Sequence, residues 1–369
     1  MNLLKTGPDV ACTSKARMAR ASKRTKTTAT STVAASANLN SAHLSRTSAQ
    51  PQQLIPSRPS LEHIPNEVLL EILSHLPTLN DHHVVFATNR ISSDELVRTP
   101  TLRALSQTSK LLRSRCLAMA WQRIELCGVS LPKHQYSYYR VIGEATKTGV
   151  RVLNACPHLL PLIQTVSVGF TRYRSAEIIP MFAACLATLP NLSTIQIIFA
   201  HFQMATAIKN GFEGKRFPSV RKIFLPSSAH HIIKSCPDLE EVTCTLETGS
   251  TIIGSLVKSN NCQKLRVLKG ISAPLPLRLV KAVPNLRHIS VQLRQNMTML
   301  TNFTLLDTIE LHTYFGLRED LPLTEVAASE VKEASKILKE NKSQAEKKVI
   351  VTKWHNIWGH GLISETVKI

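Results

Sequence analysis

The chain has 369 residues, of which 43% are hydrophobic and 19% charged, and its formal net charge at neutral pH is +20. No stretch approaches the roughly 18 consecutive apolar residues of a membrane-spanning helix, and the first residues lack the apolar segment of a secretory signal. The eight cysteines are scattered without close pairs, which argues against a zinc site or a redox motif and predicts reduced, mostly buried thiols. We therefore expect a globular protein of the cytoplasm, the nucleus or both, with no cofactor, no metal and no membrane partner.

The positive charge is unevenly distributed along the chain. Lys and Arg outnumber Asp and Glu by nine to one in residues 1–60 and by twenty to nine in residues 126–316, which gives +8 and +11. The two types balance at seven each in residues 61–125 and stand at nine to eight in residues 317–369. The surplus therefore belongs to the N-terminal segment and the middle of the chain.

Residues 1–58 are rich in Ser, Thr and Ala, with interspersed Lys and Arg and few large apolar residues. Burial cannot offset the entropy of ordering such a segment, so we expect a disordered basic arm. Its basic cluster at residues 23–26 fits a nuclear localisation signal, although a solvated tail is the simpler interpretation. A mitochondrial transit peptide has a similar acid-poor composition and stays open as an alternative.

Ordered structure is expected to begin at Leu61. Pro65 suits the first turn of a helix and Pro77 cannot continue one, and the residues between them carry an apolar stripe at helical spacing. This stripe is too wide for the short helix to cover alone, so the helix must pack on a partner. Helical spacing returns at Leu102 and continues to Ile124, which predicts two further short helices with Trp121 as an anchor.

The first helix resembles the opening helix of the F-box family, at Ile64, Pro65, Glu67, Val68, Leu69, Ile72, Leu73 and Leu76. Residues 105–113, followed by Trp121, are similar to the second half of that family, and residues 98–105 resemble the F-box variant of mushroom-forming fungi. The chain departs from the family pattern by an insertion around residues 80–99. The alternative interpretation of residues 61–125 is a helical hairpin that caps the domain behind it.

The resemblance implies a site for the Skp adaptor of a ubiquitin ligase. The residues expected to contact the adaptor, or to support that contact, are Ile64, Pro65, Val68, Leu69, Ile72, Leu73, Leu76, Leu105 and Trp121. Some of them must instead face the core of the helical domain.

Residues 126–316 repeat a strand-like phrase, apolar-x-x-apolar-x-apolar, that fits the core of a leucine-rich repeat. The instances are Ile163/Val166/Val168, Leu192/Ile195/Ile197, Val220/Ile223/Leu225, Leu239/Val242/Cys244, Leu286/Ile289/Val291 and Leu306/Ile309/Leu311, with Leu265/Leu268/Gly270 as a weaker seventh. Successive phrases begin 19 to 29 residues apart, a proline often stands two residues before them, and helical patterns lie between them. An ordinary α/β domain with a parallel sheet is the competing interpretation.

The expected fold class is therefore α+β. A small helical F-box at residues 61–125 would be followed by an irregular leucine-rich-repeat α/β solenoid at residues 126–316. Residues 317–369 would add a charged helix and a short apolar run with Trp354 and Trp358, and these would cap the last repeat.

Catalytic patterns are weak. The pairs His82–His83 and His230–His231 lack a matching ligand set at zinc spacing, and Cys236, although close to His231, stands where the repeat uses cysteine as a small core residue. We expect no enzyme.

The resemblance implies a substrate-receptor subunit of an SCF-type ubiquitin ligase, bound through the Skp adaptor to the cullin core. The protein target is unknown, and the basic surplus favours an acidic or phosphorylated one, with Arg221, Arg266 and Arg287 as candidate target-binding residues. The alternative function is a basic repeat scaffold that binds nucleic acid or acidic proteins without any ligase. Nucleic acid is the less expected partner because aromatic residues are few.

Overall fold

The computed structural model describes residues 61–77, 79, 96–127, 135–245, 248–259, 262–313, 322–354 and 362–369. The chain divides into two units, residues 1–58 and 59–369, and all described residues belong to the second. The predicted disordered arm, its basic cluster, the His82–His83 pair and Trp358 lie outside the described residues.

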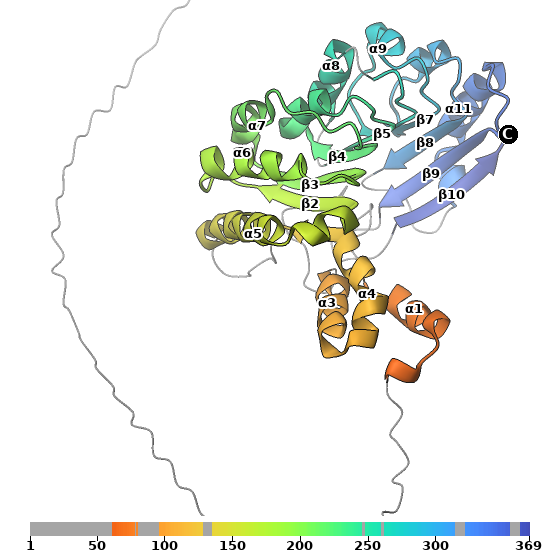
Figure 1. Cartoon of the computed structure of the whole chain (residues 1–369). Coiled ribbons are helices and arrows are strands. Elements are labelled where there is room, and N and C mark those ends of the chain that lie inside the picture. Colours follow the sequence, from red (N-terminus) through yellow and green to blue (C-terminus); the bar gives the residue numbers. More distant parts are fainter. Residues whose placement is uncertain are drawn as a thin grey trace, which may run out of the picture. The chain divides into compact units, whose positions relative to one another are not determined.

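Helices and strands alternate along most of the second unit (Figure 1). The α-helices are α1 (Asn66–Ser74), α3 (Arg98–Thr108), α4 (Lys110–Gln122), α5 (Gln135–Ala155), α6 (Ser175–Leu186), α7 (Ala205–Phe212), α8 (Ser250–Lys258), α9 (Leu277–Ala282), α10 (Leu323–Val326) and α11 (Ala328–Glu340). The 3-10 helices are η1 (Leu61–His63), η3 (Pro157–Leu162), η4 (Phe202–Met204), η5 (Ser227–Ser235) and η6 (Thr298–Asn302). The strands are β1 (Arg123–Leu126), β2 (Thr165–Phe170), β3 (Thr194–Ala200), β4 (Lys222–Pro226), β5 (Glu241–Thr245), β6 (Val267–Ile271), β7 (His288–Gln292), β8 (Thr308–Thr313), β9 (Lys348–Trp354) and β10 (Leu362–Lys368).

The described strands form one open ten-stranded sheet whose order follows the chain from β1 to β10. Neighbouring strands are parallel from β1 to β9, and β10 runs antiparallel to β9. Because each parallel neighbour needs a crossover, helical segments connect most of the strands. The fold is therefore mixed α/β, as the strand and helix patterns predict.

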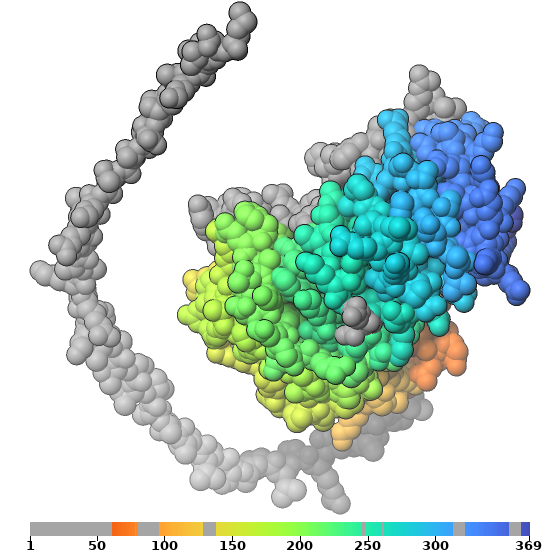
Figure 2. All heavy atoms as spheres, turned by 90° about the horizontal axis from the view of Figure 1, so that it is seen from above, coloured from red at the N-terminus to blue at the C-terminus, as the bar shows by residue number. Residues whose placement is uncertain are grey.

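The predicted strand phrases coincide with β2 to β8, and their side chains form the main core. All residues of the six stronger phrases are at most 1% exposed. Alternate residues of a strand point to opposite faces, so one face of the sheet carries the phrase residues, and helices such as α6 and α8 pack against it (Figure 1). We call the opposite face the second face. In Figure 2 the sequence colours run across the molecule in chain order, as expected when each element packs beside its neighbour in the chain.

The sheet extends beyond the predicted strand region at both ends. The last predicted helix was expected to reach Ile124, but residues 123–126 form β1, which pairs with β2 and has Ile124 and Leu126 buried in the main core. The apolar run within residues 349–369 was expected to cap the last repeat, and no strand was predicted there. It forms β9, whose alternating Val349 and Val351 are fully buried, and β10 pairs with its free edge.

Helices α1, α3 and α4 share a separate small core. It contains the buried residues Leu69, Leu73, Leu102, Leu112, Cys116 and Ala120. Pro65 stands at the N-terminal cap of α1, and the helix ends before Pro77 as predicted. The Arg115 side chain of α4 donates a 2.9 Å hydrogen bond to the carbonyl of Ile64, which fixes the start of α1.

Part of the second face is covered by residues from the helical region. Leu79, which is fully buried, packs with Ile198 of β3 and Phe224 of β4, and Leu96 lies against the same cluster. The Arg123 side chain donates a hydrogen bond to the carbonyl of Leu79. The two described residues that border residues 80–95 therefore both contact the second face.

Candidate partner-binding sites

Helix α1 exposes several large apolar side chains although its own core is filled. Val68, Leu70 and Ile72 are each 49% exposed, whereas Leu69 and Leu73 are each 3% exposed. Residues four apart share one face of a helix, so Val68 and Ile72 form a strip on one side of the buried pair. Leu70 projects on the other side of it.

The residues predicted for adaptor contact therefore separate into two groups. Pro65, Val68 and Ile72 are exposed and accessible to a partner. The others lie in or against the small core: Leu69, Leu73, Ile64, Leu76, Leu105 and Trp121. Leu61 and Leu70 are exposed as well, and the prediction from the F-box resemblance included neither. The width of the apolar stripe is the signal that could have identified Leu70.

Arg221, Arg266 and Arg287 lie in one row at the edge of the sheet where the parallel strands begin. Backbone hydrogen bonds of 2.8 to 2.9 Å connect successive members of this row, in the order Arg221, Glu240, Arg266, Arg287 and Asp307. The row therefore interleaves carboxylates with the three arginines. Arg221 lies 3.9 Å from Glu240 and Arg287 lies 3.9 Å from Asp307. Two of the three arginines are therefore partly neutralised by ion pairs within the chain.

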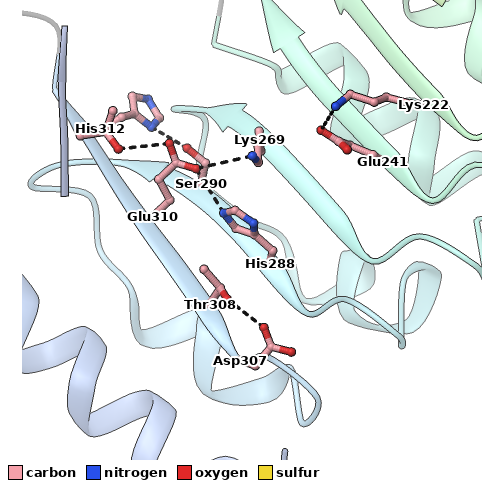
Figure 3. Close-up of polar contacts among 10 residues, drawn as sticks. Lys222, Glu241, Lys269, His288, Ser290, Asp307, Thr308, Glu310 and His312 are labelled. Atoms are coloured by element: carbon pink, nitrogen blue, oxygen red, sulfur yellow. Dashed lines mark hydrogen bonds and ion pairs between the residues drawn. The ribbon is translucent and has the colours of Figure 1, made fainter. Parts of the chain in front are cut away.

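A polar network lies on the second face across β6 to β9, with Glu310 of β8 at its centre (Figure 3). One oxygen of its carboxylate is 3.1 Å from His288 Nε2 and 4.0 Å from Lys269 Nζ, and the other accepts a 3.2 Å hydrogen bond from Thr352. The Glu310 side chain is only 17% exposed. Burial raises the pKa of this carboxyl, but the hydrogen bond from His288 and the nearby positive charges outweigh it and hold the pKa below its usual range.

Ser290 and His312 lie beside this network and contact each other. Ser290 Oγ is 3.0 Å from His312 Nδ1, and each residue is 3% exposed. Burial lowers the pKa of His312 to about 4, although the Glu310 carboxylate opposes that shift. The imidazole is therefore neutral at physiological pH. Because both side chains are buried, a substrate cannot reach this Ser–His pair.

Lys222 of β4 and Glu241 of β5 form a second ion pair on the same face, at 3.1 Å (Figure 3). Both side chains are partly exposed, at 27% and 20%. The second face from β4 to β8 thus presents paired charges rather than a surplus of one sign. A ligand on this face would meet donors and acceptors in fixed positions.

The weaker catalytic candidates do not form a site. The rings of His230 and His231 lie 3.9 Å apart on η5, and among the described residues no group of three metal-ligating side chains is present. Cys236 is 1% exposed in the main core, as predicted, and burial raises the pKa of its thiol.

No protein-family model matches the chain, and no curated protein matches it significantly. None of the described helices is both long and apolar enough to cross a membrane.

Proposed function

We propose that the chain is a substrate-receptor subunit of an SCF-type ubiquitin ligase. In this proposal α1, α3 and α4 form an F-box that binds the Skp adaptor. The sheet and its helices form an irregular leucine-rich-repeat solenoid that binds a target protein. Such a subunit performs no covalent chemistry and acts by raising the effective concentration of the target near the ubiquitin-charged enzyme.

The observation that carries the proposal is the apolar surface of α1. A nine-residue helix that fills its own core with Leu69 and Leu73 still leaves Val68, Leu70 and Ile72 about half exposed. Exposed apolar side chains that are neighbours on one side of a helix, as Val68 and Ile72 are, are typical of a protein interface. The sequence resemblance to the F-box family falls on this same helix.

The arrangement of the sheet supports the second half of the proposal. Strands in chain order, phrases 19 to 29 residues apart and helices packed against the phrase face are all typical of a leucine-rich-repeat solenoid. The second face would then present Lys222, Glu241 and the Glu310 network to a target. Arg221, Arg266 and Arg287 would contribute at the edge, where Glu240 and Asp307 partly neutralise Arg221 and Arg287.

The test is co-purification of the tagged full chain with purified Skp adaptor. We expect the wild-type chain to retain the adaptor and a Val68→Asp, Ile72→Asp variant to lose it, because two carboxylates would be desolvated in an apolar interface. Leu277→Asp is the matched control, since Leu277 on α9 is 57% exposed and lies outside α1. Unchanged thermal unfolding of the variants would show that the fold is intact.

Two results would contradict the proposal: no adaptor bound to the wild-type chain, or adaptor retained by the double variant. The first would favour the alternative of a scaffold without a ligase, and the second would refute the assignment of Val68 and Ile72 as the adaptor contact.

A further inference from the structure

A cluster of aromatic rings from two segments, α5 and the end of β3 with the residues that follow it, lies near the C-terminal ends of β2 and β3. Tyr139 of α5 stacks on Phe199 of β3 with ring centroids 6.5 Å apart, and its ring meets His201 edge-on at 6.3 Å. His201 in turn stacks on Phe202 at 4.4 Å. The rings thus form a continuous series that ends at Phe202.

Phe202 projects from this cluster into solvent. It is 70% exposed, more than the other large apolar side chains on the exposed part of the described chain, which reach at most 57%. Its position is nevertheless fixed, because Met204 in the same short helix is 2% exposed and the His201 ring accepts a hydrogen bond from the Gln203 amide. An aromatic side chain that is both exposed and held in place loses little entropy when a partner covers it.

Two arginines flank the cluster. The Thr171 hydroxyl donates a 2.9 Å hydrogen bond to the Tyr139 carbonyl, which places Arg172 and Arg140, the residues that follow these two, in the same region. Arg172 also donates a 2.9 Å hydrogen bond to Gln203, the residue after Phe202.

Arg172 differs from the other cations nearby, because its side chain donates to the Gln203 amide oxygen and not to a carboxylate. Lys147 and Arg174 both pair with Glu177. The charge of Arg140 helps to lower the pKa of Glu144, one helical turn further along α5, whereas within the ranges that the structure describes Arg172 forms no ion pair. The positive charge of Arg172 is therefore not compensated by a carboxylate in the described structure, unlike the charges of the Lys222–Glu241 pair and the Glu310 network on the second face.

We propose that Phe202 and Arg172, with Arg140 beside them, form a docking site for a short acidic peptide segment that carries an apolar side chain next to Asp or Glu. The apolar side chain would cover Phe202, and an adjacent carboxylate would pair with the guanidinium group of Arg172. Aromatic and arginine side chains together are typical of interface positions that contribute most of the binding energy. The inference deepens the proposed function and rests on it, because it names the chemistry of the target that the receptor would hold.

The ring geometry favours a peptide over single-stranded nucleic acid. Binding of successive bases requires several rings with free faces along a basic groove. Here Tyr139, Phe199 and His201 use their ring surfaces on one another, and only Phe202 has a largely free side chain.

The test uses the purified full chain and a positional-scanning library of short peptides, each position fixed in turn as acidic, basic, polar, aliphatic or aromatic. We expect selection of acidic positions beside an apolar one. Selected peptides are then measured by fluorescence anisotropy. Phe202→Ala and Arg172→Glu should each weaken binding about tenfold or more, as expected for central interface residues.

The matched control is Leu277→Ala with Arg278→Glu, which removes an exposed apolar residue and an adjacent exposed arginine on α9 without touching the cluster. Any of four results would overturn the inference. The chain could select no peptides from the library, or select peptides with basic positions. The Phe202 and Arg172 variants could bind the selected peptides as tightly as the wild type does, or the chain could bind a single-stranded RNA probe and not the peptides. Adaptor co-purification is independent of these measurements. If the wild-type chain does not bind the adaptor but still selects acidic peptides, the proposed ligase function is refuted and the proposed peptide site is not.

Discussion

The buried histidine of β8 should make the protein less stable as the pH falls from neutral to mildly acidic values. His312 is 3% exposed, and burial lowers its pKa to about 4, against an ordinary value of 6.5. Between these two values the unfolded chain binds a proton that the folded chain does not, so folding becomes less favourable as pH decreases. Above pH 6.5 this residue adds no dependence on pH.

The size of the effect follows from the shift. A difference of about 2.5 pKa units corresponds to about 3 kcal/mol of unfolding free energy over the whole interval, at about 1.4 kcal/mol for each unit. By pH 5 about 2 kcal/mol of this should already be lost. Glu310 acts in the same direction, because its lowered pKa gives stability that disappears as the carboxylate is protonated, but at lower pH than the first part of the His312 effect.

The assay is urea unfolding followed by circular dichroism at pH 7.5 and pH 5. It compares the wild-type chain with His312→Asn, in which the amide takes the place of the ring nitrogen near Ser290. We expect the wild type to lose about 2 kcal/mol more than the variant between the two pH values. His158→Asn, at an exposed position, serves as the control and should behave like the wild type. Equal losses in wild type and His312→Asn would refute the assignment of the pH dependence to His312.

Three further changes test the packing. Gly270→Ala should destabilise the chain by about 2 kcal/mol or more in urea unfolding, because φ is +71° and a Cβ would lie 2.3 Å from the carbonyl oxygen of Cys244, whereas Gly254→Ala in the open helix position of α8 should be neutral or stabilising. Leu73→Ala should cost about 3 kcal/mol and Leu70→Ala much less, and equal costs would contradict the assigned orientation of α1. Trp121→Ala should lower the melting temperature of residues 59–369 as a whole, and Trp121→Phe should lower it less, because Trp121 packs against both cores. If a protease-protection assay shows that only α1, α3 and α4 unfold in Trp121→Ala, Trp121 does not stabilise both cores.

Strands β2 to β8 could be predicted because each has a clear local signal. In a phrase such as Val166-Ser167-Val168 the apolar residues alternate, and a proline before most phrases ends the preceding helix. Every phrase residue is then buried for the same reason, since one face of each strand meets the helices. The N-terminal helix was predictable in the same way from its two prolines and its apolar stripe.

Other elements have no distinct local signal. The apolar spacing from Leu112 to Trp121 continues through Ile124, so a helix and the strand that follows it look alike in sequence. The run at Val349 is short and follows a charged helix, so its burial depends on the free edge of β8, which local sequence does not reveal.

The candidate sites also divide into features with a local sequence signal and features that depend on tertiary packing. The stripe on α1 predicts a partner surface, but only the packing of Leu69 and Leu73 shows which part of the stripe is exposed. Ser290 is in register with Glu310, and His312 is in register with Gln292, so the phrase register alone does not pair Ser290 with His312. Tyr139 and His201 come from unrelated segments, and only the tertiary structure brings these rings together.

The junction between α4 and β1 has a consequence for the proposed ligase role. Helix α4 ends at Gln122 and β1 begins at Arg123, so no flexible segment separates the three-helix unit from the sheet. Trp121 packs against both cores, and the guanidinium of Arg103 lies 4.7 Å from its ring centroid. In a receptor of the proposed kind, a stiff connection between the adaptor surface and the target surface keeps the target at a defined distance from the ubiquitin-charged enzyme. A flexible tether would spread the target over a larger volume and lower its effective concentration there. The shared packing of Trp121 is therefore the feature of the fold that would convert two separate binding surfaces into one receptor.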